Sequence, residues 1–260
     1  MHAAQENDSR ISSSIAVVLI ARTCLLLVLT MSEGPVVENP HPAHIPERIA
    51  ISGAYVTLEP LAEEHDESLY ELIGNESKHD LWRYIPKGPF STLEGYKGQL
   101  NEFRQSRSSQ FYVIVCNKTK ELLGSIGLIS IHPEHRTMEI GYVMFSHKMQ
   151  RTCAGTDTIY LLLRTAFDTH QYRRVEWKCN NLNEKSKSAA QRYGFVFEGV
   201  FRQHYIIRGR NRDTAWFSII DSDWPIRKAA FEAWLTPSNF DEEGKQKASL
   251  AQLRTMSSKT

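Results

Sequence analysis

The chain has 260 residues, 41% of them hydrophobic, which is enough for one core of ordinary domain size plus terminal segments. Its 31 basic and 30 acidic residues give a formal net charge of +1, so it lacks the basic excess typical of a nucleic-acid-binding protein, and no nucleic-acid partner is expected. The four cysteines stand far apart without a Cys-x-x-Cys pair, which argues against a zinc site or disulfide framework and favours reduced thiols in an intracellular protein.

An apolar segment lies near the N-terminus. Residues 15–30, IAVVLIARTCLLLVLT, are interrupted by Arg22, and a charge at that depth in a bilayer would cost at least ~2.5 kcal/mol. The segment is also shorter than the roughly 20 apolar residues of a membrane span and ends without a small-x-small cleavage site. Two interpretations stay open: translation starts at Met31 and the protein is cytoplasmic, or residues 15–30 anchor it to a membrane.

The remaining chain divides into a linker, one domain and a tail. Prolines are frequent up to residue 50, which favours a disordered N-terminal extension over residues 1–50. Residues 51–235 carry strand and helix patterns and form the expected domain, and residues 236–260 are polar and are expected to be a tail.

Strand and helix signals follow one another in a definite order within this domain. Alternating or apolar runs predict strands over residues 54–61, 110–116, 122–131, 137–145, 173–179, 198–207 and 214–220. Apolar residues at helical spacing, with capping and stop signals, predict helices over residues 61–74, 91–106, 156–170 and 183–195. The order predicts an α/β (α+β) fold, with a mixed, mostly antiparallel sheet and helices on both of its faces.

A loop of small residues precedes the third helix. The stretch QRTCAGT, residues 150–156, carries no bulky apolar side chain. A helix start leaves four backbone N–H groups unpaired and carries about half a positive charge, so a phosphate can bind there if side chains do not block it. Asp157 is an adverse feature because it adds negative charge nearby, and a simple capped turn is the alternative interpretation.

Five stretches of the domain carry a family resemblance. They read GAYVTLEPLAEEH, MEIGYVMF, QRTCAGTD, YRRVEWKCNNLNEKSKSAAQRYGF and EGVFRQHYIIRGRNRDTAWFSIID. With these stretches, the span from Gly53 to Trp224 resembles the GCN5-related N-acetyltransferase (GNAT) superfamily, and within it the branch that includes ribosomal-protein N-terminal acetyltransferases. Gln150 and Gly155 fit the family's acyl-CoA loop, Q/R-x-x-G-x-G/A, whereas Cys153 occupies its first glycine position and puts a close backbone approach there in question.

The resemblance implies a GNAT fold that binds acetyl-CoA where the sheet is splayed between its fourth and fifth strands, residues 137–145 and 173–179. The pantetheine chain would pair with the free edge of residues 143–145, and the N–H of Phe145 would donate to the thioester carbonyl. The residues expected to hold the diphosphate are Gln150, Arg151, Thr152, Cys153, Ala154, Gly155 and Thr156. No metal is expected.

The same resemblance suggests roles for three polar side chains. Asn183 would bind the cofactor and Ser186 would lie near its sulfur, although both also fit an N-cap and a first-turn serine. Glu139 would act as a base through a water molecule, or else would be a structural glutamate paired with an arginine. The slot of the family's general-acid tyrosine holds Ala190, so that role is not assigned to Tyr193, and Ser186 or water would protonate the thiolate.

The acceptor side of the site is less defined. The stretch RGRNRD, residues 208–213, is either an acidic-substrate clamp or a solvated hairpin tip, and His204, Tyr205 and Trp216 either line an acceptor groove or are ordinary sheet residues. Cys153 has no placed histidine and is interpreted as a packing residue. We therefore predict an N-acetyltransferase that moves acetyl directly from acetyl-CoA to a protein N-terminus or a small amine. A non-catalytic acyl-CoA-binding module is the alternative.

Overall fold

The computed structural model describes residues 34–257. The apolar segment 15–30 and Met31 lie outside the described residues, so both interpretations of the N-terminus stay predictions. Between residues 34 and 257 no helix has the length and apolar character needed to cross a membrane. The chain divides into two units after His41, and the fold described below is that of the unit from Pro42 onward.

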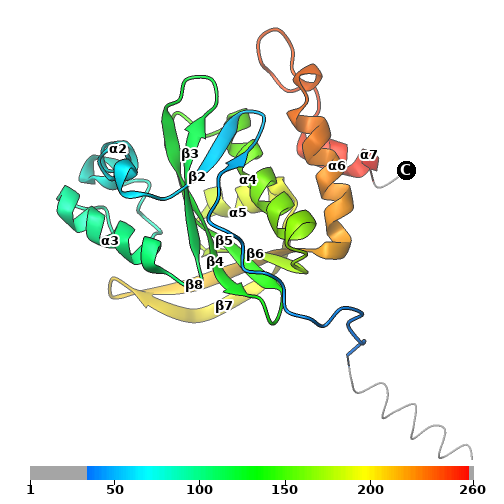
Figure 1. Cartoon of the computed structure of the whole chain (residues 1–260), viewed down its shortest axis with the longest axis horizontal. Coiled ribbons are helices and arrows are strands. Elements are labelled where there is room, and N and C mark those ends of the chain that lie inside the picture. The colour runs from blue at the N-terminus through cyan, green and yellow to red at the C-terminus, as the bar shows by residue number, and fades with distance from the viewer. Residues whose placement is uncertain (1–33, 258–260) are drawn as a thin grey trace, which may run out of the picture. The chain divides into compact units, whose positions relative to one another are not determined.

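One sheet of eight strands, in the order β1-β2-β3-β4-β5-β6-β8-β7, organises this unit (Figure 1). Its strands are β1 (Ile51–Ser52), β2 (Val56–Pro60), β3 (Gln110–Cys116), β4 (Leu122–His132), β5 (Thr137–Phe145), β6 (Arg174–Asn180), β7 (Val196–Ile207) and β8 (Arg210–Ile220). The longer helices are α3 (Leu93–Gln105), α4 (Cys153–Arg164), α5 (Glu184–Tyr193), α6 (Trp224–Leu235) and α7 (Leu250–Ser257). The short helical segments are η1 (Glu63–His65), α2 (Asp66–Leu69), η2 (Tyr70–Gly74), η3 (Glu76–Lys78), η4 (Thr165–Thr169), η5 (Asp221–Asp223) and η6 (Pro237–Asn239). The predicted mixed α/β fold class is confirmed.

The pairing of β5 and β6 differs from that of all other neighbouring strands in the sheet. It is parallel, whereas the other pairs are antiparallel. Its ladder covers three residue pairs, from Thr137 opposite Arg174 to Glu139 opposite Glu176. β5 then runs on to Phe145 with β4 at its other edge. The β5–β6 ladder therefore involves only the first residues of each strand, and the splay between them stays a prediction.

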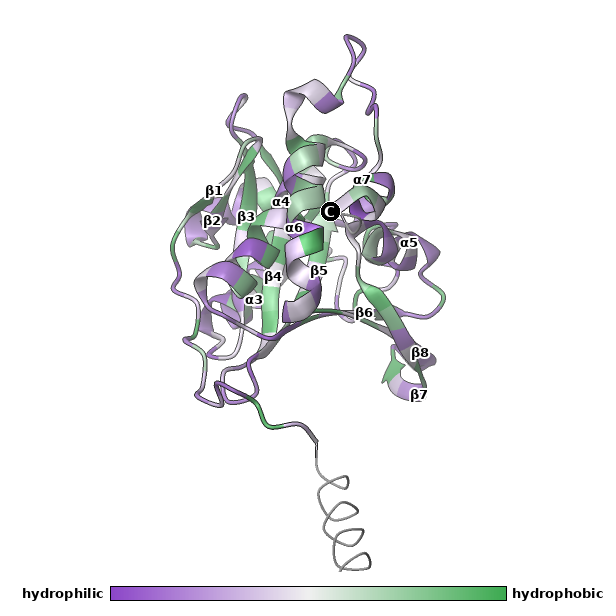
Figure 2. Ribbon diagram, turned by 90° about the vertical axis from the view of Figure 1, so that its right-hand side faces the viewer, coloured by the Kyte–Doolittle hydropathy of each residue, from purple (hydrophilic) through white to green (hydrophobic). Residues whose placement is uncertain are grey.

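Helices cover both faces of the sheet, each over its own apolar core. On one face α2, η2 and α3 bury Leu69, Ile73 and Leu100 against Val113 of β3. On the other face α4, α5 and α6 pack against the sheet through a larger core. Figure 2 shows hydrophobic residues along the central strands and along α4. The helices therefore fold by burying one apolar face each, as the spacing of their residues predicts.

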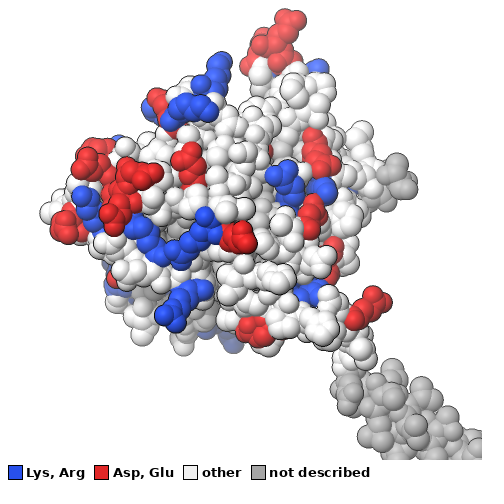
Figure 3. All heavy atoms as spheres, in the orientation of Figure 1, with Lys and Arg blue, Asp and Glu red and all other residues white. Residues whose placement is uncertain are grey.

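The surface carries charges of both signs. On the face shown in Figure 3, Asp and Glu side chains gather where α2 and α3 lie in Figure 1, and Lys and Arg side chains lie beside them. This mixture fits the net charge of +1.

The folded unit begins before the predicted boundary at residue 51. The Ala43 N–H donates to the carbonyl of Pro133 at 3.0 Å, and the guanidinium of Arg48 donates to the carbonyls of Arg104 and Ser106. The later part of the predicted linker is therefore attached to the domain by hydrogen bonds to backbone carbonyls, which residue composition does not reveal.

The fold also continues beyond the predicted end at residue 235. The segment expected to be a polar tail contains η6 and α7, and Leu250 of α7 is only 1% exposed. The indole N–H of Trp234 donates to Oε1 of Gln246 at 2.8 Å. A few apolar residues in a polar segment are enough to dock a short helix, which is why the tail assignment was wrong for residues 237–257.

Candidate active site

The small-residue loop leads directly into α4. This helix begins at Cys153, three residues earlier than expected, with Thr152 as its N-cap. The Thr152 hydroxyl donates to the carbonyl of Met149 at 2.6 Å, and no side chain caps the helix. The Thr152 side chain therefore caps none of the first backbone N–H groups of α4, and a turn capped by its N-cap side chain does not describe this loop. Such a helix start suits an anion.

Gly155 packs closely against the end of β5. A Cβ atom there would lie 3.4 Å from the ring of Phe145 and 3.7 Å from the hydroxyl of Tyr193. Gln150 ties the same loop to β5, because its Nε2 donates to the carbonyl of Phe145 at 3.1 Å. Arg151 is exposed and has a backbone φ of +64°. The loop is thus held against the strand that the pantetheine chain is expected to follow.

The backbone of Phe145 points away from β4. Phe145 pairs with Gly124, and the N–H of Ser146, the residue directly after β5, donates to the carbonyl of Leu123. In an antiparallel ladder this pattern directs the N–H and C=O of Phe145 toward the opposite edge, where Gln150 reaches its carbonyl. A Cβ on Gly124 would lie 2.2 Å from the carbonyl oxygen of Met144, so only glycine allows this close approach.

Asp157 does not oppose an anion at the start of α4. Its side chain is buried, and its Oδ2 accepts hydrogen bonds from the N–H groups of Tyr55, at 2.6 Å, and Val56, at 3.1 Å. Burial raises the pKa of this carboxyl, although those two N–H groups act in the opposite direction. The Asp157 carboxylate therefore binds backbone N–H groups at the start of β2.

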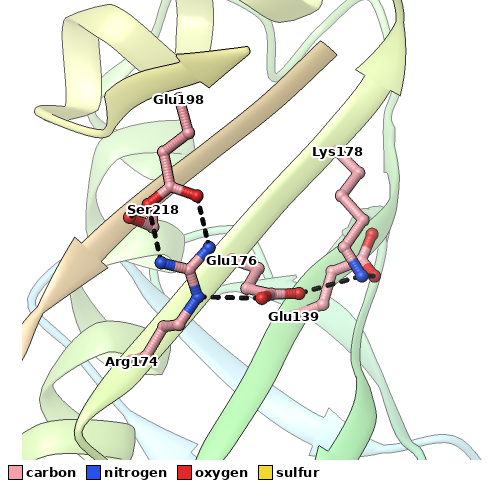
Figure 4. A network of polar contacts seen from close by, with 6 residues as sticks. All are labelled: Glu139, Arg174, Glu176, Lys178, Glu198 and Ser218. Atoms are coloured by element: carbon pink, nitrogen blue, oxygen red, sulfur yellow. Dashed lines mark hydrogen bonds and ion pairs between the residues drawn. The ribbon is translucent and has the colours of Figure 1, made fainter. Parts of the chain in front are cut away.

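Glu139 lies on β5 beside a lysine of β6. Its Oε2 is 3.0 Å from Nζ of Lys178, which also lies 2.9 Å from Oε2 of Glu176 (Figure 4). The ammonium of Lys178 further sits 4.2 Å from the ring centroid of Trp216. Glu139 is 8% exposed, and burial raises its pKa while Lys178 partly offsets that effect. Glu139 therefore has a cationic partner, but it is a lysine rather than the arginine considered from the sequence.

A chain of ion pairs continues from this point toward the edge of the sheet. Arg174 bridges Glu176, at 2.8 Å, and Glu198, at 2.6 Å, and Ser218 donates to Glu198 at 2.6 Å (Figure 4). Burial acts to raise the pKa of Glu176, but hydrogen bonds from Arg174 and Lys178 outweigh it, so this pKa is lowered. Glu176 is held as a carboxylate, whereas burial favours proton uptake by Glu139. The alternation of RRVEWKC places these β6 side chains on one face, so the lysine could have been found from the sequence.

Asn183 and Ser186 occupy the start of α5 as the capping interpretation requires. The Oδ1 of Asn183 accepts from the N–H of Ser186 at 3.2 Å, and the Oγ of Ser186 accepts from the indole N–H of Trp177 at 2.9 Å. Asn183 is half-buried, so capping does not remove it from the site. The cofactor role of Asn183 and the protonation role of Ser186 stay predictions.

The hairpin of β7 and β8 is held by its tip. Its turn is only Arg208 and Gly209, because β8 already begins at Arg210. The guanidinium of Arg208 donates to the carbonyl of Ile85, at 2.8 Å, and to that of Gly88. Arg208 is therefore bound to the protein and is not a purely solvated tip residue. It joins the hairpin to the segment before α3.

Aromatic side chains cluster on the same hairpin. The ring centroids of His204 and Tyr205 lie 3.8 Å apart, and those of Phe201 and Trp216 lie 4.6 Å apart. Tyr205 and Phe201 are about half exposed. Since Trp216 also contacts Lys178, the cluster adjoins Glu139.

Cys153 has the environment of a packing residue. Burial raises the pKa of its thiol, which disfavours the reactive thiolate. In the part of the chain that the structure describes, no group of three or more His, Cys, Asp or Glu side chains could hold a metal ion.

The geometry has a counterpart among known proteins. The family model described as "Acetyltransferase (GNAT) domain" matches residues 56–196. The chain belongs to the GNAT acetyltransferase family. It is an N-acetyltransferase, an enzyme that transfers an acetyl group to an amine, and the family resemblance noted in the sequence is confirmed.

Individual GNAT proteins extend the comparison. A solved GCN5-related N-acetyltransferase from Brucella melitensis is 37% identical, with a TM-score of 0.81, over 84% of this chain and 100% of that one. The ribosomal-protein-serine acetyltransferase of Escherichia coli (strain K12) is 28% identical over 182 residues, 68% of this chain and 98% of its own length. A ribosomal L7/L12 alpha-N-protein acetyltransferase solved in complex with coenzyme A shares the fold, with 22% identity and a TM-score of 0.59 over 67% of this chain and 99% of that one.

Proposed function

We propose that this GNAT protein transfers acetyl from acetyl-CoA directly to an amine bound beside it, through a ternary complex. The observation that carries the proposal is the start of α4. Its N-cap residue makes no side-chain cap, and the helix start lies next to the end of β5, where the backbone N–H of Phe145 is turned away from β4. A diphosphate and a thioester carbonyl need donors in just these two places.

The donor coenzyme would extend from α4 to the middle of the sheet. Its diphosphate would bind the loop and helix start, residues 150–156, and its pantetheine chain would follow residues 143–145 of β5, with Asn183 on the other side. The Phe145 N–H would donate to the thioester carbonyl, which gains negative charge as the amine attacks. A donor fixed by the sheet stabilises that charge more than it stabilises the ground state.

Glu139 would handle the proton of the acceptor. The acceptor arrives mostly as an ammonium ion at pH 7, so it must lose a proton before its nitrogen can attack. Glu139 would take this proton through a water molecule, and burial that raises its pKa makes it a better base than an exposed glutamate. The new C–N bond forms, the nitrogen releases its second proton, and the C–S bond breaks. The coenzyme thiolate takes a proton from Ser186 or water, and the proton released by the nitrogen replaces it.

The acceptor is proposed to be a protein N-terminus or a small amine. The Escherichia coli relative acts, by its name, on a ribosomal protein, so peptide N-termini form the first arm of the test. We also propose a cytoplasmic location. The module alternative is not favoured, because the relatives compared are acetyltransferases.

Two measurements test the proposal. Titration calorimetry with coenzyme A should show binding, and a thiol-release assay with acetyl-CoA should show turnover with at least one member of a panel of peptides and small amines. Glu139→Gln should bind coenzyme A as wild type does but lose about 100-fold or more in kcat/KM. Absence of coenzyme binding would overturn the proposal, binding without thiol release would identify a module, and a wild-type rate for Glu139→Gln at every pH would remove this residue from catalysis.

A further inference from the structure

Arg192 lies beside the proposed coenzyme site but is not one of the residues proposed to bind the coenzyme. It belongs to the last turn of α5, and its Nη1 donates to Oγ1 of Thr156, in the first turns of α4, at 3.1 Å. Its guanidinium also lies 5.2 Å from the ring centroid of Tyr193 and 5.0 Å from that of Trp234. These contacts hold a full positive charge at the N-terminal end of α4.

Two neighbouring arginines have a clear structural reason for their positions. Arg254 of α7 donates to the carbonyls of Arg192, at 2.7 Å, and Gln191, at 3.3 Å, while Arg227 of α6 donates to that of Gly194, at 2.8 Å. These carbonyls belong to the C-terminal end of α5, where the helix dipole favours a cation. Arg227 and Arg254 therefore stabilise the end of α5.

Stabilising a helix end does not explain the position of Arg192. Its side chain approaches the N-terminal end of α4, where a cation is unfavourable. The start of α4 carries about half a positive charge. Among the ion pairs within residues 34–257, none joins Arg192 to a carboxylate. The carboxylate of Asp157 is engaged by the backbone of β2 instead.

The three arginines also repel one another. Burial, followed by the charges of Arg227 and Arg192, lowers the pKa of Arg254. Arg227 is balanced by Asp223, at 3.3 Å, whereas the ion pairs within residues 34–257 give neither Arg192 nor Arg254 a carboxylate, and of these two it is Arg192 that contacts α4. An anion between Arg192 and the start of α4 would offset part of this repulsion.

We propose that Arg192 binds a phosphate group of the coenzyme, an inference that rests on the proposed function. A guanidinium presents five N–H donors in a planar fork that matches phosphate oxygens, and Thr156 occupies one nitrogen of that fork. The coenzyme offers phosphate in two places, the diphosphate and the 3′-phosphate of its adenosine. Both present the same chemistry to Arg192.

Calorimetry on the full-length protein separates these sources. Arg192→Gln, which keeps most of the stem against Trp234, should weaken the binding of coenzyme A by about 10- to 100-fold, the range for a charged hydrogen bond. Arg192→Lys should fall between this variant and wild type. Arg173→Gln, at an exposed arginine before β6, is the matched control and should bind like wild type. If Arg192 holds the 3′-phosphate, wild type and Arg192→Gln should bind 3′-dephospho-CoA equally, and if it holds the diphosphate, the variant should be weaker with both ligands.

A substrate without phosphate supplies the second readout. Thiol release from acetyl-pantetheine should be the same in wild type and Arg192→Gln, whereas a variant that merely disturbs the fold would be slower with this substrate too. Binding of coenzyme A by Arg192→Gln within about twofold of wild type, or an equal loss in Arg173→Gln, would overturn the inference while the proposed function stands. If wild type itself binds no coenzyme A, the proposed function fails.

Discussion

The carboxylate of Asp157, near the start of α4, accepts a hydrogen bond from the backbone N–H of Tyr55, which lies 102 residues earlier in the chain, over an Oδ2–N distance of 2.6 Å. A Cβ on Gly53 would lie 2.5 Å from the same oxygen, so the glycine makes room for the carboxylate. This contact attaches the proposed diphosphate site to the start of β2, the second strand in the order of the sheet.

Removing this carboxylate should destabilise the domain. Asp157→Ala leaves the part-buried N–H of Tyr55 and the buried N–H of Val56 without their acceptor, at a cost of about 1–3 kcal/mol in the free energy of unfolding. Urea unfolding measures the loss. Glu64→Ala, at an exposed acidic residue of η1, is the control and should change stability by less than ~0.5 kcal/mol. Equal losses in both variants would contradict the anchoring role.

The ion pair between Glu139 and Lys178 should set the acidic limb of the pH profile. The ammonium of Lys178 lowers the pKa of Glu139 against the larger effect of burial, so Lys178→Gln should raise this pKa further. A base works only when deprotonated, and the acidic limb of kcat/KM should therefore move to higher pH in Lys178→Gln. Lys187→Gln, whose partner Glu184 is exposed, should leave the profile in place. An unshifted limb in Lys178→Gln would mean that another group is being titrated.

The close approach of β4 to the end of β5 should depend on Gly124. The Cβ of Gly124→Ala would lie 2.2 Å from the carbonyl oxygen of Met144, so the strands must separate, at about 1–3 kcal/mol in stability, and coenzyme binding at Phe145 should weaken. Gly98→Ala offers the contrast, because this glycine of α3 has open space around its Cβ position. Alanine there should raise stability by about 0.5–1 kcal/mol. Thermal unfolding and calorimetry compare the two, and stability gained in both would refute the packing described for Gly124.

The C-terminal helix should contribute to the stability of the whole domain. Leu250 is 1% exposed, and Leu250→Ala should lower the free energy of unfolding by about 2–5 kcal/mol in a single transition. Met256, in the same helix, is 66% exposed, and Met256→Ala should have little effect. A separate early transition in Leu250→Ala, with the main one unchanged, would show that α7 folds apart from the domain.

The sequence by itself determined the order of the main elements from β2 to β8, the fold class, the family and the loop before α4, but it did not indicate β1 or α6. These features depend on local periodicity, on Gly155 and Gln150, and on stretches such as MEIGYVMF, all of which can be read within a few neighbouring residues. The alternation of side chains along β6 also indicates the partner of Glu139, because it places Lys178 on the same face of the strand as Glu176.

Only the tertiary structure decided where charges are neutralised and where the domain ends. Asp157 looked adverse to an anion until its carboxylate proved to bind β2, and the supposed tail proved to contain a docked helix. Arg192 reaches α4 from α5 only because the two helices pack on the same face of the sheet. The physical reason is the same in each case: a hydrogen bond or ion pair across many residues depends on how the elements pack, and no local pattern records that.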